Sequence, residues 1–263
     1  MLTWAAHPVG EAIRPESLSL DYVHGLSESH RIWQPFAEAS GLANQNALEL
    51  PWSGVSNRSW STWANPESVL LDRWKRNSDT PFVAVAHSYG ANLLLRLLSR
   101  TTVKNLKGVV LICPFYRPET SDITWSFLQK SFESVDSFVE NRIALFGRTT
   151  PAALRATVHQ RVKESIDPMG WVRFLEAYSQ TPHLALGRVR CPTLVIAGAQ
   201  DQSARPEDAG LLTKRIPGAQ LKIIPDAGHF PMLETPKVLA NHLDSFVHSI
   251  ERPAQRRPIP HIC

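Results

Sequence analysis

A serine that could act as a nucleophile lies between a strand pattern and a helix pattern. Residues 82–86 are apolar, Ser88 sits within Ala-His-Ser-Tyr-Gly, and the leucine-rich run 91–98 follows directly. This succession predicts a buried strand, a tight turn and a helix, with the serine hydroxyl held at the turn. The alternative is an ordinary strand–turn–helix junction in which the serine caps the helix.

An aspartate and a histidine follow two later strand patterns. Asp201 comes just after the apolar run 192–198, and His229 follows 220–224 within Gly-His-Phe-Pro. Side chains beyond the carboxyl ends of parallel strands can meet at one edge of a sheet. A histidine there can take the proton of an attacking serine hydroxyl, and an acid can hold the imidazole in the required tautomer. The sequence therefore predicts a Ser88–His229–Asp201 triad.

Four other carboxylates compete with Asp201 for the role of the acid. Asp208 is expected in the next helix, and Asp226 is too close to the histidine in sequence to reach its ring easily. Glu119 and Asp122, which follow the strand pattern 108–113, are the remaining rivals.

From Leu18 to about Ile250 the chain resembles the α/β-hydrolase family. Residues 22–26 (Tyr-Val-His-Gly-Leu) resemble the family's strand and His-Gly turn, and Gly-x-x-Asp at 198–201 with Gly-His-Phe-Pro at 228–231 is the most specific part of the match. Residues 48–56 resemble its D-x-P-G-x-G-x-S loop. Ala86 replaces the first glycine of the usual G-x-S-x-G, and Trp52 and Val55 depart from the loop pattern.

The resemblance implies an oxyanion hole made of two backbone N–H groups, those of Leu26 and Tyr89. Gly25 would let the chain turn there without a Cβ in the way. The resemblance also implies that His24 supports this loop rather than acting as a base.

The fold class implied is α/β, with a mostly parallel sheet of about seven strands flanked by helices. Strand patterns fall at 2–6, 18–23, 46–50, 81–87, 108–113, 192–198 and 220–224, and helix patterns at 31–40, 66–77, 90–100, 205–215 and 236–250.

Residues 114–190 contain no strand pattern and are expected to form a helical cap inserted in the core. Helical stretches are predicted at 122–133, 135–146, 151–165 and 168–180. The alternative is that these helices belong to the main body. With 114–190 as the cap, the expected core comprises 1–113 and 191–250, and the Pro- and Arg-containing tail 251–263 is expected to be disordered.

An apolar substrate pocket is expected beside the triad. Besides Leu26 and Tyr89, the candidate lining residues are Phe115, Trp125, Phe127, Trp171 and Phe230. Such a lining favours an acyl or aromatic substrate of moderate size.

Composition narrows the possible partners of this 263-residue chain. A net charge of +4 with 20% charged residues gives no case for nucleic acid binding. No apolar run is long enough to span a membrane, and the first residues lack an export pattern, so a cytoplasmic protein is expected. With three cysteines, no CxxC pair, no paired metal ligands and no glycine-rich phosphate loop, neither cofactor nor metal is implied. The expected partner is a small-molecule substrate, and the protein is expected to be a monomer or homodimer.

The function favoured by these features is a serine hydrolase that cleaves an ester or thioester through an acyl-enzyme. The same triad would serve carbon–carbon bond hydrolysis in a diketone, lactone opening, amide cleavage or an acyl-transfer cyclase. An alternative of another class is a non-catalytic ligand receptor, because fold alone does not settle function.

Overall fold

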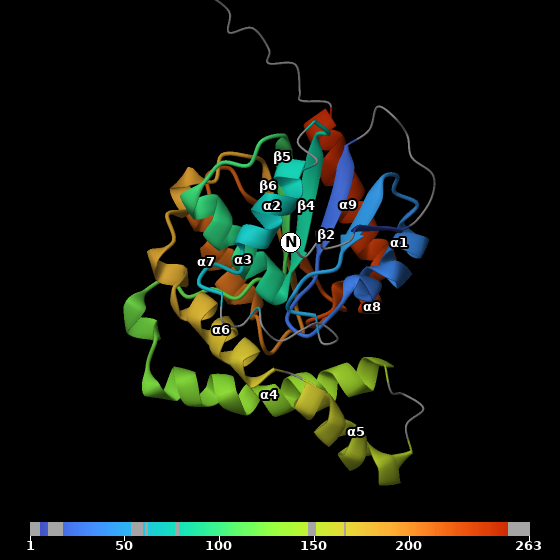
Figure 1. The fold of residues 1–263 in the computed structure, drawn as a ribbon, viewed down its shortest axis with the longest axis vertical. Helices are drawn as coiled ribbons and strands as arrows, with labels where there is room; N and C mark the ends of the chain where they lie inside the picture. The colour runs from blue at the N-terminus through green and yellow to red at the C-terminus, as the bar shows by residue number, and fades with distance from the viewer. Residues whose placement is uncertain are drawn as a thin grey trace, which may run out of the picture.

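A seven-stranded sheet with helices on both sides forms the body of the protein (Figure 1). The computed structural model describes residues 6–9, 18–53, 60, 63–76, 79–146, 151–165 and 167–251. The strands are β1 (Ala6–Val9), β2 (Ser19–Val23), β3 (Gln45–Leu48), β4 (Phe82–His87), β5 (Leu106–Ile112), β6 (Thr193–Gly198) and β7 (Gln220–Ile224). Their order in the sheet is β1-β3-β2-β4-β5-β6-β7, so the expected number of strands is confirmed.

All neighbouring strands are parallel except β1, which pairs antiparallel with β3. β1 covers residues 6–9 instead of the expected 2–6, of which residues 2–5 lie outside the described part of the chain. Pairing sets its position, because Ala6 lies opposite Leu48 and Val9 opposite Gln45. The hydrophobic pattern of so short an edge strand carries no such information.

The helices form two layers on either side of the sheet. Figure 1 shows α2 (Ser68–Arg76), α3 (Ser88–Arg100) and α7 (Pro206–Arg215) on one side, and α1 (Gln34–Ser40), α8 (Pro231–Glu234) and α9 (Pro236–Glu251) on the other. A 3-10 turn, η1 (His30–Trp33), leads into α1. β4 is buried at every residue, as expected of a strand covered on both faces.

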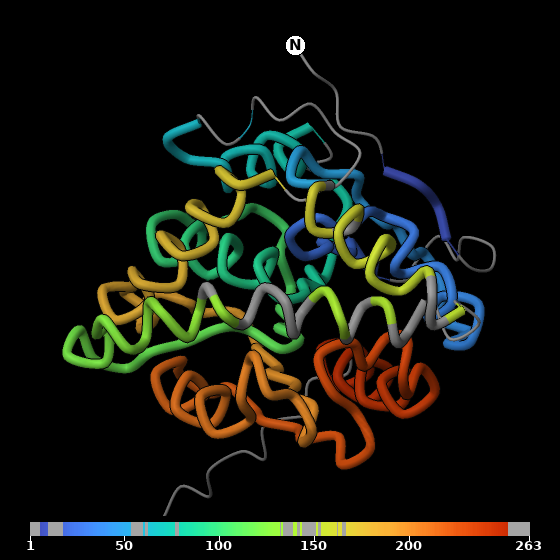
Figure 2. The backbone as a smooth tube through the Cα atoms, turned by 90° about the horizontal axis from the view of Figure 1, so that it is seen from below, coloured from blue at the N-terminus to red at the C-terminus, as the bar shows by residue number. Residues whose placement is uncertain are grey.

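Three helices lie between β5 and β6 in the sequence: α4 (Trp125–Phe146), α5 (Ala152–Ser165) and α6 (Pro168–Ser179). The rest of this connection includes the 3-10 turns η3 (Thr120–Asp122), η4 (Thr181–His183) and η5 (Leu186–Arg188). Figure 2 shows α4 running across one end of the molecule. The expectation of separate helices at 122–133 and 135–146 is wrong, because α4 is continuous. Residues 125–146 contain neither glycine nor proline, so no residue type there breaks the helix.

No helix in the described part of the chain is both long enough and apolar enough to cross a bilayer.

The carboxyl end of β6 lies directly beneath the loop that follows β7. A Cβ placed on Gly198 would lie 2.1 Å from the carbonyl oxygen of Gly228 and 2.4 Å from that of Ala227. The N–H of Gln200 donates to the Ala227 oxygen at 2.9 Å and fastens the loop in this position. A glycine is therefore required at the end of this strand for steric reasons.

Substituting Gly198 with alanine should force the loop away from β6. We expect Gly198→Ala to lower the free energy of unfolding by about 1–3 kcal/mol or more, as overpacking does. Urea denaturation measures this. Gly187→Ala is the matched control, because a Cβ on Gly187 meets nothing within 4 Å. Equal stabilities for the two variants would contradict the close approach of the loop.

Candidate active site

Ser88 occupies the tight turn between β4 and α3. Its φ of 53° lies in the left-handed region, which is uncommon for residues other than glycine. The chain leaves His87 in an extended conformation and enters the helix at once. A Cβ on Gly90 would lie 2.5 Å from the carbonyl oxygen of His24, so the start of α3 packs tightly against the end of β2. Only a glycine fits at that position, while Ala86 is accommodated in the buried strand.

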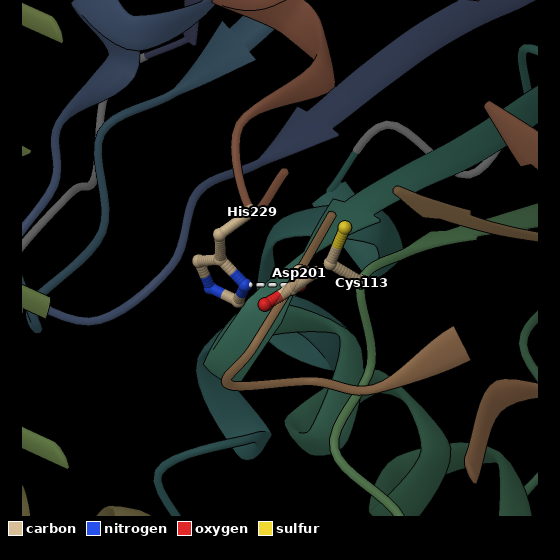
Figure 3. Close-up of side chains that lie close together, drawn as sticks. All are labelled: Cys113, Asp201 and His229. Atoms are coloured by element: carbon tan, nitrogen blue, oxygen red, sulfur yellow. Dashed lines mark hydrogen bonds and ion pairs between the residues drawn. The ribbon is translucent and has the colours of Figure 1, made fainter. Parts of the chain in front are cut away.

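The structure brings the three predicted site residues together. His229 Nε2 lies 3.1 Å from Ser88 Oγ, and His229 Nδ1 lies 2.7 Å from Asp201 Oδ2. Figure 3 shows His229 and Asp201 pointing toward each other from the loops after β7 and β6. Asp201 also accepts the N–H groups of Ser203 at 2.8 Å and Ala204 at 3.0 Å. These two bonds orient the carboxylate toward the imidazole.

The Asp201–His229 pair favours its charged form. Burial raises the pKa of Asp201, but the positive charge and hydrogen bond of His229, with the two N–H donors, outweigh it and lower that pKa below 3.8. Burial likewise lowers the pKa of His229, but the Asp201 charge and hydrogen bond leave that pKa above 6.5. The imidazole is thus a stronger base than a free histidine.

The rival acids lie in other arrangements. Asp208 accepts hydrogen bonds from Arg117 and Arg205. Asp122 accepts the N–H of Glu119 at the start of η3, and Glu119 and Asp226 are exposed. Among the described residues, Asp201 is the carboxylate within hydrogen-bond distance of the His229 ring.

Two backbone N–H groups lie in the loops beside Ser88. The neighbours of Leu26 are engaged, because Gly25 donates to Glu28 and Ser27 donates to Trp52. The N–H of Leu26 has no acceptor within the described residues. The N–H of Tyr89 belongs to the first turn of α3, where helical N–H groups lack an acceptor in their own helix.

His24 supports the loop that carries Leu26, and its ring is held in one neutral tautomer. Its Nδ1–H donates to the carbonyl oxygen of Gly25 at 2.8 Å, and its Nε2 accepts the N–H of Leu50 at 3.2 Å. Burial lowers the pKa of His24, which keeps the ring uncharged. Trp52, a departure from the family pattern, donates its indole N–H to the His24 carbonyl at 2.9 Å. Both residues therefore support the loop.

A second buried histidine–carboxylate pair joins the two loops of the site. His87 Nε2 donates to the carbonyl oxygen of His229 at 2.8 Å, and His87 Nδ1 lies 3.1 Å from Glu28 Oε2. The same oxygen of Glu28 accepts the N–H of Gly25 at 2.6 Å. This pair was not predicted from the sequence. The position of His87 directly before the predicted nucleophile could have indicated one member of the pair, but no local pattern indicated Glu28.

Cys113 lies close to Asp201 and His229, as Figure 3 shows. One ligand atom from each of the three lies within 4.8 Å of the others. Burial raises the pKa of the Cys113 thiol well above its usual range, so the thiol keeps its proton. Its Sγ contacts the carbonyl oxygen of Gly228 at 3.7 Å. A protonated thiol is a poor metal ligand, and these groups fit a hydrogen-bonded cluster better than a metal centre.

A cavity of 510 Å³ lies among α4, α6 and the turn after β6, and its lining includes neither Ser88, Asp201 nor His229. Phe115 and Phe127, two of the predicted pocket residues, line it. Trp125, also predicted for the pocket, does not line this cavity, because its side chain is 87% exposed at the first residue of α4. The residue pattern at the start of a helix does not show whether that end is exposed to solvent or packed against the rest of the protein.

The remaining two predicted pocket residues also lie outside the lining of this cavity. Phe230 is fully buried, with its ring 5.2 Å from that of His229 and 5.4 Å from that of His87. Trp171 is partly buried and packs edge-on against Phe174, a lining residue. Phe230 therefore supports the histidine by packing.

The buried pair predicts a strong dependence of stability on His87. His87→Met removes the imidazole and leaves the Glu28 carboxylate buried beside an apolar side chain, which should cost about 3–5 kcal/mol of unfolding free energy. Adding Glu28→Gln should recover part of this loss. The measurement is a double-mutant cycle in urea.

The matched control is the exposed pair His248–Asp244 on α9, separated by 3.2 Å. His248→Met and Asp244→Asn should show a coupling near zero, as expected for exposed ion pairs. Additive effects of His87→Met and Glu28→Gln would show that the two buried groups do not interact.

Comparisons with known proteins agree with this architecture. The model of the "Alpha/beta hydrolase family" matches residues 22–242. Lipase 1 of Psychrobacter immobilis is 38% identical over 71 residues, which cover 27% of this chain and 22% of that lipase. Monoacylglycerol lipase ABHD6 of Rattus norvegicus is 23% identical over 199 residues, which cover 68% of this chain and 58% of that protein. The chain thus spans about a fifth of the bacterial lipase that it matches.

Solved structures share the fold over almost the whole chain. MenH from S. aureus superposes with a TM-score of 0.68 at 17% identity, covering 95% of this chain and 100% of that one. The esterase EaEST from Exiguobacterium antarcticum superposes with a TM-score of 0.69 at 14% identity, covering 94% and 95%. These likenesses show the fold, and the family match over residues 22–242 shows that the chain belongs to the alpha/beta hydrolase family.

Proposed function

We propose that this protein hydrolyses esters through an acyl-enzyme formed on Ser88. The observation that carries the proposal is the continuous contact from Ser88 Oγ through the His229 ring to Asp201, with separations of 3.1 and 2.7 Å. An esterase needs a nucleophile, a base and an orienting acid in this arrangement. The lipase names of the matched relatives agree with ester chemistry.

In the first half of the reaction, Ser88 Oγ attacks the ester carbonyl and its proton passes to His229 Nε2. The bond from the carbonyl carbon to the alcohol oxygen then breaks, and the alcohol leaves with the proton from the imidazole. In the second half, a water molecule gives its proton to His229 and attacks the acyl-enzyme. The acid is released, and the proton returns to Ser88.

The backbone N–H groups of Leu26 and Tyr89 are the proposed donors to the oxyanion of each tetrahedral intermediate. Tyr89 directly follows the nucleophile at the start of α3, and Leu26 lies in the loop that packs against that helix. Such donors act without reorganisation because the backbone already holds them in place. Glu28 and His24 fix the loop that carries the Leu26 group.

The helices α4 to α6 are proposed to act as a cap that shapes the acyl site. The cavity is lined by Phe115 and Phe127, and the Phe115 ring lies 5.6 Å from the ring of His229. An acyl chain of moderate size would extend from Ser88 into this cavity. Thioesters would react by the same steps, with a thiol as the leaving group.

The proposed nucleophile should react once with a fluorophosphonate probe. The adduct should lie on the peptide that contains Ser88, and Ser88→Ala should abolish both labelling and ester turnover, by on the order of a thousandfold or more. Mass spectrometry of the labelled protein locates the adduct. Ser245→Ala, on α9, is the control and should label normally. Absence of an adduct on Ser88 in the folded protein would favour a ligand receptor.

Labelling should also depend on pH through His229. Only the neutral imidazole accepts the serine proton, so the rate should fall as pH drops through the pKa of His229. Because Asp201 raises that pKa, the midpoint should lie above 6.5. A pH profile of the labelling rate measures it. A midpoint below that value would contradict the Asp201–His229 contact.

Asp201→Asn should slow ester turnover severely while the protein stays folded. An asparagine amide can donate to His229 Nδ1 and so stabilise the wrong tautomer, with the proton on Nε2, which costs up to about ten-thousandfold in kcat. Asp226→Asn, an exposed change in the same region, is the matched control and should be mild. Equal losses for the two variants would remove Asp201 from the proposed mechanism.

A further inference from the structure

Aromatic rings form one part of the lining of the cavity among α4, α6 and the turn after β6. Phe115 packs against Phe174 and Tyr178, with ring centroids 4.7 and 5.2 Å apart, and Phe127 packs against Tyr178 at 4.9 Å. All four rings line the cavity. Burial raises the pKa of Tyr178 to about 12, so its phenol adds no negative charge at neutral pH.

The charged residues of the lining are mostly cationic. Arg117, Lys130 and Arg205 line the cavity, with Asp122 as the acidic residue. One oxygen of the Asp122 carboxylate already accepts a backbone hydrogen bond, from the N–H of Glu119 at 3.2 Å. The side chains that line this cavity therefore carry an excess of positive charge.

One carboxylate outside the lining is shared by two of these cations. Asp208 accepts from Arg117 Nη1 at 3.3 Å and from Arg205 Nε at 3.2 Å. One negative charge is thus placed between two guanidinium groups. Counting Asp208 and Asp122 against the three cations still leaves one positive charge, and the described residues provide no ion pair for Lys130.

Arg117 is held where it can serve both the aromatic and the charged part of the cavity. Its guanidinium carbon lies 5.3 Å from the ring centroid of Phe127 and 5.6 Å from that of Tyr178. Its Nε–H is buried and has no hydrogen-bond acceptor among the described residues. A buried donor without an acceptor is unfavourable, and an acceptor on a bound molecule would relieve it.

We propose that this cavity, called here the cationic pocket, binds an anionic group, so that the substrate is an ester whose acyl chain ends in a carboxylate or similar anion. The proposal rests on the proposed ester hydrolysis at Ser88 and names its substrate class. The acyl part is favoured over the alcohol because it stays on the serine after the alcohol has left. The aromatic rings would contact the chain, and the cations its charged end.

The test compares pairs of para-nitrophenyl esters that differ in charge alone. Monoesters of succinate, glutarate and adipate are each matched with the branched alkanoate in which two methyl groups replace the carboxylate oxygens. At low ionic strength the best charged ester should have a kcat/KM about tenfold higher than its neutral partner, as one charge-assisted hydrogen bond would give. Added salt should reduce this preference.

Two variants locate the preference in the cationic pocket. Lys130→Gln and Arg117→Gln should each lower the ratio of charged to neutral turnover several-fold, and Lys130 is exposed, so its variant keeps the fold. Lys104→Gln is the charge-matched control, because Lys104 pairs with Asp79 on another part of the surface and should leave the ratio unchanged. Equal turnover of charged and neutral esters, or a preference that survives both variants, would overturn the proposal.

A binding measurement separates this inference from the proposed function. Ser88→Ala is titrated in a calorimeter with the anilide of glutaric acid and with its neutral branched counterpart. Tighter binding of the anilide, weakened by Lys130→Gln, supports the cationic pocket whether or not esters are turned over. If no ester is turned over but binding is charge-selective, the proposed ester hydrolysis is contradicted and the cationic pocket is still supported. Equal binding of both compounds would count against the pocket.

Discussion

The site depends most on how the backbone at His229 is held in place. The loop after β7 crosses the end of β6 where only a glycine fits, and a Cβ on Gly198 would lie 2.1 Å from the Gly228 oxygen. In addition, the His87 ring donates a hydrogen bond to the His229 carbonyl oxygen at 2.8 Å. With the backbone fixed on both sides, the imidazole reaches Asp201 and Ser88 at the same time. A displacement of about 1 Å would break one contact, which is enough to cost a large factor in rate.

The Glu28–His87 pair extends this constraint to the other side of the site. Glu28 accepts the N–H of Gly25, next to the loop residue Leu26, while its histidine partner holds the loop of His229. Two segments far apart in sequence are thereby joined through buried hydrogen bonds. Burying a histidine and a carboxylate is unfavourable unless each has its partner, so the arrangement tolerates few alternatives. The loop of Leu26 and the loop of His229 are therefore positioned around Ser88 by the same set of hydrogen bonds.

The sheet edge and the helical insertion have separate tasks in the proposed function. The proposed nucleophile, base and acid all lie just beyond the ends of strands β4, β7 and β6, as expected of a parallel sheet. The aromatic and cationic lining of the cavity comes largely from outside the strands, including α4 and α6. Changes in the insertion can therefore alter the substrate without altering the chemistry. This division agrees with the variety of functions that one fold supports.

Local sequence patterns predicted the number of strands, most of the helices and the approach of Ser88, Asp201 and His229. They could do so because strand periodicity, small turn residues and chain order are properties of neighbouring residues. They did not decide the position of β1, which is set by pairing with β3. Nor did they separate Trp125, exposed at the start of α4, from Phe127 two residues later, which lines the cavity. The link from Glu28 to His87 spans 59 positions and leaves no local signal. Burial and partnership of side chains depend on contacts between distant segments, and only the folded chain brings those segments together.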